Sequence, residues 1–242
     1  KERSDYMING DLLYDNRTTV YDKKNSLSGL LNLAYSKGKN KLSLKGLFNN
    51  DFSNSLGLRN GYDVSNQPTR FEYKSYNSEL SANGLMSLVL DGTHALGSRL
   101  TFDWATSFSD AFKKQPDQKI ISFRTPNDAK TGYYIRLGNE NSPEIRNAGR
   151  IFSDLNEKIY NAGFNLTYQF TVKGVKQKLK FGSLNYYRDR NTVVDALGYA
   201  ALDFRGVTIA ETKNTGFSNI FSDANVNAYG LTLATIGNNS TS

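Results

Sequence analysis

Residues 159–170, IYNAGFNLTYQF, alternate strictly along the chain. The even-numbered positions from Tyr160 to Phe170 carry apolar or aromatic side chains, and the odd-numbered positions from Asn161 to Gln169 carry polar ones or glycine. A period of two indicates a strand with one apolar and one polar face. At roughly 12 residues, this run is about twice a typical globular strand and matches the 9–11 residues with which a tilted strand crosses a bilayer.

The same alternation recurs twice upstream and predicts three hairpins with short turns. They span about residues 26–52, 73–112 and 158–191. Their turns are expected at residues 37–40, 91–97 and 173–176. The return limb of the third hairpin alternates poorly at Ser183 and Asn185, which predicts a bulge there.

Long connections join these hairpins on the other side, and loops of such length are usually functional. They are expected at about residues 53–73, 113–157 and 193–242. Within them the sequence predicts short strands over Lys119–Arg124 and Tyr133–Leu137, and short helices near Asp154 and over Phe217–Ala228. Residues 1–25 are polar and turn-rich, and we expect no more than strand ends there.

Short turns on one side and long loops on the other are typical of outer-membrane barrels. The sequence therefore predicts an all-β fold, an antiparallel transmembrane β-barrel arc of about six long strands in three hairpins. Because a barrel needs at least about eight strands, we expect residues 1–242 to be a partial barrel domain cut from a longer protein. Its expected location is the outer membrane of a Gram-negative bacterium.

The composition restricts the possible chemistry. The chain has no Cys and one His, so a disulfide framework and a thiolate metal site are excluded, and no cofactor is expected. A mean hydropathy of −0.55 is compatible with a barrel, since half of each strand faces a wet lumen. The net charge of +7 resides largely in turns, without a basic stripe that alternates with aromatics, so nucleic acid is not an expected partner.

Two segments suggest a family. Residues Asn32–Gly61, NLAYSKGKNKLSLKGLFNNDFSNSLGLRNG, resemble a barrel hairpin of the TonB-dependent receptors of Bacteroidetes. In that family an aromatic-ended strand, a basic turn and a K-x-x-L-F-N-like limb lead into a long outer loop. The segments Asn161–Phe170 and Leu179–Asn191 look like a second such hairpin. The family's signal peptide, energy-coupling box, plug and C-terminal strand have no counterpart in these residues.

The resemblance implies a transport function and no enzymatic one. Such receptors import a scarce ligand, for example a siderophore, a cobalamin or an oligosaccharide. The implied partners are membrane lipid, the plug domain of the same full-length protein, a TonB-type energy-coupling complex, and the small-molecule or oligosaccharide ligand.

Two other classes of protein fit the same pattern. One is another outer-membrane barrel, such as a porin or an assembly protein, and the other is a soluble β-rich adhesin or carbohydrate-binding module. The outward aromatics near the short turns suit an interfacial girdle or a soluble core; they are Tyr35, Trp104, Tyr168, Phe170 and Phe181. The inward polar rows suit a lumen or a solvated sheet face equally well.

Candidate ligand contacts come from the predicted outer side. Tyr133, Tyr134 and Arg136 combine the aromatic and arginine side chains that dominate binding surfaces. Arg188, at the expected outer end of a strand, belongs to a solvated rim or to a ligand vestibule.

No catalytic residues are expected. Asp103 and Asp110 fall on opposite faces of their strand, so they cannot form an acid–base pair. His94 is expected in a solvated turn. The sequence lacks phosphate-binding loops and nucleophile elbows.

Overall fold

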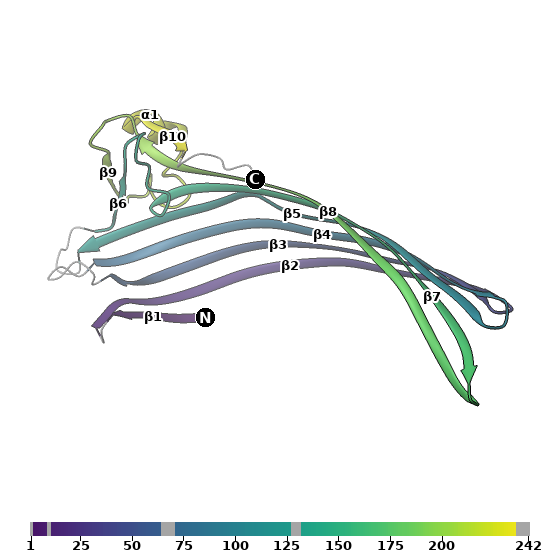
Figure 1. The fold of residues 1–242 in the computed structure, drawn as a ribbon. Helices are drawn as coiled ribbons and strands as arrows, with labels where there is room; N and C mark the ends of the chain where they lie inside the picture. Colours follow the sequence, from purple (N-terminus) through teal and green to yellow (C-terminus); the bar gives the residue numbers. More distant parts are fainter. Residues whose placement is uncertain (1, 9–10, 64–70, 127–131, 236–242) are drawn as a thin grey trace.

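A computed structural model describes residues 2–8, 11–63, 71–126 and 132–235, and its main feature is one antiparallel β-sheet (Figure 1). Six long strands form the sheet: β2 (Asp11–Lys37), β3 (Asn40–Asp63), β4 (Phe71–Leu96), β5 (Leu100–Pro126), β7 (Ala148–Val172) and β8 (Val175–Ala201). Two short strands end it, β1 (Glu2–Ile8) beside β2 and β10 (Leu231–Thr235) beside β8. The sheet is therefore open, as expected for an arc of a barrel.

Three short turns lie together at one end of the sheet, on the right in Figure 1. They join β2 to β3, β4 to β5, and β7 to β8, which confirms the three hairpins. Gly38, Gly97 and Gly174 adopt φ angles of 62°, 89° and 79° in these turns. Such left-handed conformations are accessible to glycine because it has no Cβ. We call the opposite end of the sheet the far end.

The long strands contain 24–27 residues each, so the connections expected at 53–73, 113–157 and 193–242 are shorter than predicted, although residues 132–147 and 202–235 lie outside the long strands. Strand structure continues to Asp63 in β3 and to Pro126 in β5, and β8 ends only at Ala201. Most of residues 1–25 also lies in strands. Toward the far end polar and apolar side chains are mixed on both faces of these strands, so the strict alternation is lost although backbone pairing continues.

The predicted bulge is in the wrong place. The pairing of β7 with β8 is regular from Gly149 to Val172, and Ser183 and Asn185 lie within it. The register instead shifts between Gln115 and Gln118 of β5, where the segment contains Pro116. Proline lacks the N–H that a ladder needs, so bulges accommodate it.

Four smaller predictions have mixed outcomes. Residues Lys119–Arg124 are confirmed as strand within β5, and Tyr133–Leu137 is confirmed as β6 (Tyr134–Leu137). The helix over Phe217–Ala228 is only partly correct, because α1 covers Asp223–Tyr229. The helix near Asp154 is wrong, since this residue lies in β7, and His94 lies in β4 and not in a turn.

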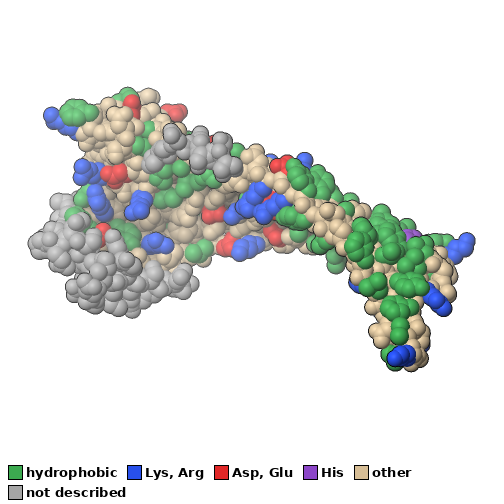
Figure 2. Space-filling view, viewed as in Figure 1, with side chains coloured by type: hydrophobic (Ala, Val, Ile, Leu, Met, Phe, Trp, Pro, Cys, Tyr) green, Lys and Arg blue, Asp and Glu red, His purple; other side chains and the backbone are tan. Residues whose placement is uncertain are grey.

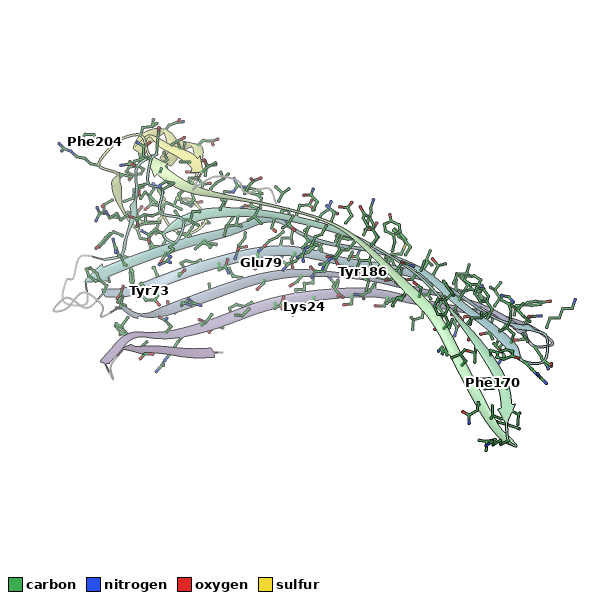
Figure 3. The ribbon with its side chains drawn as sticks, in the orientation of Figure 1. Lys24, Tyr73, Glu79, Phe170, Tyr186 and Phe204 are labelled. Carbon is green, nitrogen blue, oxygen red and sulfur yellow. The ribbon has the colours of Figure 1, made fainter. Side chains whose placement is uncertain are left out.

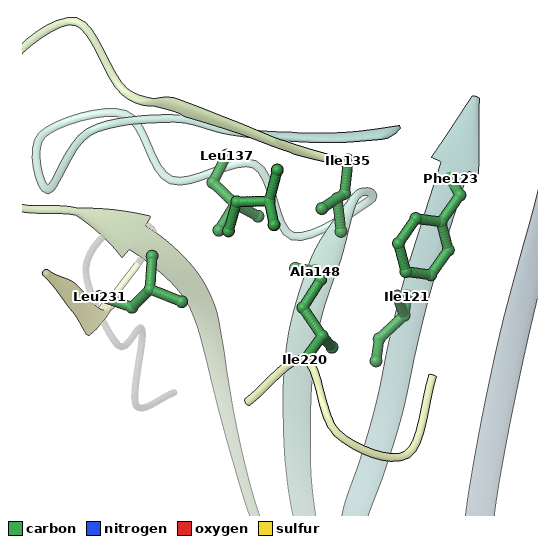
Figure 4. Close-up of a cluster of buried hydrophobic side chains, with 8 residues drawn as sticks. Ile121, Phe123, Ile135, Leu137, Ala148, Ile220 and Leu231 are labelled. Carbon is green, nitrogen blue, oxygen red and sulfur yellow. The ribbon is translucent and has the colours of Figure 1, made fainter. Parts of the chain in front are cut away.

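A buried hydrophobic core lies only at the far end of the described sheet, under β6, β9 (Val207–Ala210) and the segment around α1 (Figure 4). We call residues 132–147 and 202–235 the cap. The bulge in β5 adds one residue and so reverses which side chains point to each face. Before the bulge, even-numbered residues such as Phe108 lie on one face; after it, the odd-numbered Ile121 and Phe123 lie on that face. The core residues are Ile121, Phe123, Ile135, Leu137, Ala148, Ile209, Ile220 and Leu231.

Candidate functional site

One face of the sheet is apolar at the turn-bearing end. Residues opposite each other in an antiparallel sheet share a face, so one row crosses all six strands through Leu31, Gly46, Leu88, Phe108, Tyr160 and Tyr187. Figure 2 shows hydrophobic side chains gathered over this end. We define the apolar belt as the large apolar side chains of this face from that row to the turns, among which Thr106, Ser183 and Asn185 are polar interruptions. The belt includes Leu31, Leu33, Tyr35, Leu42, Leu44, Leu88, Leu90, Leu96, Leu100, Phe102, Trp104, Phe108, Tyr160, Phe164, Leu166, Tyr168, Phe170, Leu179, Phe181 and Tyr187.

Aromatic side chains border the belt on both sides. Phe108 and Tyr187 flank Tyr160 with ring-centroid distances of 5.1 and 6.1 Å. On the turn side, Phe170 lies near the tip of the β7–β8 hairpin (Figure 3). The residues from Tyr160 to Phe170 span about 24–28 Å if the strand rises about 3.4 Å per residue and tilts about 35–45°. This height matches the band of about 25 Å on transmembrane barrels.

Charged residues end the belt on β5, β7 and β8, whereas the same row carries Phe48 on β3 and Met86 on β4. In the next row toward the far end, Asp110 lies opposite Lys158, and Lys158 lies opposite Asp189. A row of charged side chains next to an apolar belt on the turn side is the arrangement expected where a hydrocarbon layer meets water.

No element of the described chain covers the belt, because the buried core is at the far end. Leu88 is 42% exposed, Tyr168 41% and Phe181 68%. Soluble monomers rarely expose a contiguous apolar face that crosses six strands. The belt therefore needs an apolar neighbour that is absent from these residues.

The opposite face of the same strands is mainly polar, and its side chains bind each other across strands. A groove of about 860 Å³ extends over β4, β5, β7 and β8 and is lined mainly by this face. The exceptions to its polarity include Leu30, Leu47 and Leu85. The cross-strand bonds are Lys45 Nζ to Asp91 at 2.8 Å, Thr93 Oγ1 to Asp103 at 2.8 Å, Ser87 Oγ with Ser109 Oγ at 2.8 Å, and Asn161 Nδ2 to Ser107 at 3.0 Å.

His94 has a specific partner on the belt side. Its Nε2 accepts a hydrogen bond from the indole Nε1 of Trp104 at 3.1 Å. The side chain is thus fixed beside the only Trp of the chain.

Tyr134 and Arg136 lie on β6 at the far end, and register places them on the polar face. Tyr134 pairs with Arg124 of β5, and Arg136 pairs with Thr208 of β9. Together with Arg205, which precedes β9, these residues line a cavity of about 370 Å³.

Tyr133 is separated from them, because it packs against the core of the cap. The Nζ atom of Lys74 lies 4.3 Å from the centroid of its ring. Burial, reinforced by a hydrogen bond with Glu72, raises the pKa of the Tyr133 phenol to about 12. Lys74 also forms an ion pair with Glu211. Tyr133 thus belongs to a packed polar cluster where the cap meets β4.

Arg188 lies in the middle of β8 and not at the outer end of a strand. Thirteen further residues follow before β8 ends at Ala201, which is roughly 43 Å at about 3.3 Å per residue. Its Nε donates to Glu157 Oε2 at 2.9 Å, and Arg190 Nε lies 3.7 Å from the same oxygen. Arg188 is therefore not brought together with Tyr134 and Arg136.

The sequence did not identify Arg124 or Arg205 as partners of Arg136. Arg124 and Arg205 lie 81 positions apart, and Arg124 was expected only at the end of a short strand within a long connection. Only the pairing of β5 with β6 and of β6 with β9 brings the three arginines to one cavity. The only hint in the sequence was that the predicted short strand Lys119–Arg124 has a basic residue at each end.

The described residues hold no group of three or more His, Cys, Asp or Glu side chains suited to a metal ion. No helix in the described part of the chain is long and apolar enough to cross a bilayer. The chain matches no protein-family model, and no curated protein is detectably similar to it.

Proposed function

We propose that the chain forms part of the wall of an outer-membrane β-barrel, with the apolar belt toward lipid and the polar face toward the lumen. The observation that carries the proposal is the belt itself, a bilayer-high apolar surface on one face of an antiparallel meander. Lipid supplies the apolar neighbour that the belt lacks. The hydrogen-bonded side chains of the other face are suited to a wet interior.

The open edges of the sheet support an arc of a larger barrel. In the described chain, β1 pairs only with residues 11–18 of β2, and β10 pairs only with residues 197–201 of β8. The remaining edge groups need hydrogen-bond partners within a bilayer, because lipid offers none. Further strands of a longer protein satisfy them by closing the barrel.

We further propose that the barrel belongs to a TonB-dependent importer of a scarce ligand, such as a siderophore, a cobalamin or an oligosaccharide. The basis is the resemblance of the hairpins around residues 32–61 and 161–191 to that family. In this function a plug domain contacts the polar face, a TonB-type complex supplies energy, and the far end meets the ligand. The cavity beside Tyr134 and Arg136 opens at that end.

Conductance of the whole protein in planar lipid bilayers tests the proposal. A plugged importer inserts but passes little steady ion current, whereas removal of the plug opens a stable conductance. A steady open current from the intact protein would indicate a passive porin. Failure to insert under conditions that insert known barrels would contradict the membrane assignment.

A further inference from the structure

Three arginines from separate segments meet at the far end of the sheet. Arg124 of β5, Arg136 of β6 and Arg205 before β9 line the cavity of about 370 Å³ with Tyr134 and Thr208. The register places Arg124 and Tyr134 in one row with Tyr73 of β4, which Figure 3 shows at the end of its strand. The cavity therefore lies on the polar face.

These three guanidinium groups form no ion pair within the described part of the chain. The Nε atom of Arg124 is buried and has no hydrogen-bond partner. The side-chain contacts are with aromatic rings: Arg124 with Phe71 and Tyr134, each at 5.8 Å, and Arg205 with Phe204 at 5.1 Å. The nearby carboxylate of Asp203 accepts from the backbone N–H of Arg205.

Two other arginines, Arg150 and Arg188, are paired with carboxylates. Arg150 contacts both carboxylate oxygens of Asp117 at 2.9 Å, and Arg188 contacts Glu157. Three like charges around one cavity repel each other, and a buried donor without a partner is costly. An anion in the cavity would reduce the repulsion between the three guanidinium groups and accept a hydrogen bond from the Arg124 Nε.

We propose that this cavity binds the anionic groups of a small soluble ligand, either carboxylates or phosphates on a compact body. Guanidinium groups bind both kinds of oxyanion in a bidentate manner, and the Thr208 hydroxyl adds a donor. The volume is within the range of about 300–1,000 Å³ typical of small-molecule sites. The Tyr134 ring offers an apolar surface to the body of the ligand.

The height of the cavity above the belt excludes a lipid headgroup as its ligand. Only this part of the inference rests on the proposed function, because it assumes that the belt lies in a bilayer. Arg124 follows Phe108, in the last row of the belt, by 16 positions of β5. That separation corresponds to about 53 Å along the strand at about 3.3 Å per residue, or roughly 37–43 Å above the belt at a tilt of about 35–45°. Headgroups extend only about 5–8 Å beyond the hydrocarbon, so they do not reach the cavity.

Calorimetric titration of the purified whole protein in detergent tests the proposal. The probes are citrate, glucose 6-phosphate and, as a neutral control, glucose. We expect at least one anion to bind in a salt-sensitive way and glucose not to bind. Arg136→Gln and Arg205→Gln, which change exposed side chains, are each expected to weaken binding at least tenfold. Arg190→Gln removes the same charge from the polar face outside the cavity and should leave the affinity unchanged.

Two results would overturn the proposal. One is that citrate and glucose 6-phosphate bind no tighter than glucose, or bind the Arg136→Gln and Arg205→Gln variants as tightly as the wild type. The other is binding only to vesicles that contain phosphatidylglycerol, with no response to citrate or glucose 6-phosphate, which would indicate a headgroup site. These measurements need no transport, so they are independent of the conductance experiment: either proposal can fail while the other holds.

Discussion

Leu88 and Leu85 lie on the same strand three positions apart, and they face opposite sides of the sheet. Their exposed fractions are nearly equal, 42% and 37%. Exposure alone therefore does not distinguish them, and in a soluble protein both would contact water. In our account Leu88 contacts lipid and Leu85 faces the lumen.

We expect Leu88→Arg to destabilise the barrel by about 2–4 kcal/mol, the cost of a cation near the bilayer midplane. Leu85→Arg is the matched control and should cost much less, because its charge stays hydrated. Urea titration of the protein in lipid vesicles measures both. Equal tolerance of the two substitutions would remove the basis for a lipid-facing belt. The same comparison applies to Leu166→Arg and Asn165→Arg on β7.

Tyr133 provides a pH test of the cap. Its folded pKa of about 12 lies above the unfolded value of about 10. The contribution of the neutral phenol to stability is therefore complete below pH 10 and is lost as the pH rises from about 10 to about 12. Tyr133→Phe should remove one late tyrosine ionisation from an ultraviolet titration. A titration curve unchanged above about pH 11 would show that this phenol ionises elsewhere.

The tight turn of the β7–β8 hairpin contains an unfavourable residue. Lys173 adopts a φ of 49°, the only positive value for a non-glycine residue in the described chain. Asn tolerates this region better, and Asn-Gly is the preferred pair in such turns. Lys173→Asn should therefore stabilise the protein by about 0.5–1 kcal/mol, measured as a higher urea midpoint. Lys39→Asn, in the turn of β2 with β3, is the control and should give no gain.

The β5 strand connects the belt to the core of the cap through its bulge. Phe123 is fully buried, and its removal should cost about 3–5 kcal/mol. Because the belt shares no core with the cap, Phe123→Ala should expose residues 202–235 to protease while the three hairpins stay resistant. Equal loss of protection in both regions would show that cap and belt unfold as one unit.

The sequence predicts the strands only where one face is apolar and the other is polar. Alternation located the first and third turns and the belt, because the two faces of the strands differ there, whereas the second turn, expected at 91–97, lies between Leu96 and Leu100. Beyond Asp110 and Lys158 apolar side chains such as Val193 and Val194 fall on both faces among polar ones, and the strands are held by backbone pairing and by bonds such as Ser53 to Asp22 at 2.7 Å. Such bonds leave no period in the sequence, so the local pattern predicts connections where the strands continue. The β5 bulge further hid Ile121 and Phe123 by reversing their parity.

The candidate site shows the same limit. Tyr134 and Arg136 were found from residue type alone, whereas Arg124 and Arg205 required knowledge of strand pairing. Arg188 was placed at a strand end because β8 was expected to stop near residue 191, and it lies in an ion pair with Glu157. Contacts between residues distant in sequence decide such a site, and the local pattern does not encode them.

At the scale of the whole molecule, the sheet has two zones with different neighbours. The turn-bearing half carries an uncovered apolar belt, and the far half carries hydrated strands and a cap with its own core. If the belt lies in a bilayer as we propose, the far half projects well beyond it. The arginine cavity then lies where the proposed soluble ligand would arrive.

A nitroxide scan of β7 tests the orientation of the belt most directly. The chain has no Cys, so single cysteines from Tyr160 to Phe170 can be labelled one at a time in the protein reconstituted in lipid. We predict that collisions with lipid-soluble oxygen peak at even-numbered positions and that collisions with a water-soluble nickel chelate are lowest at those positions. Nickel collisions that peak at the even-numbered positions would show that water covers the belt and would contradict the membrane account.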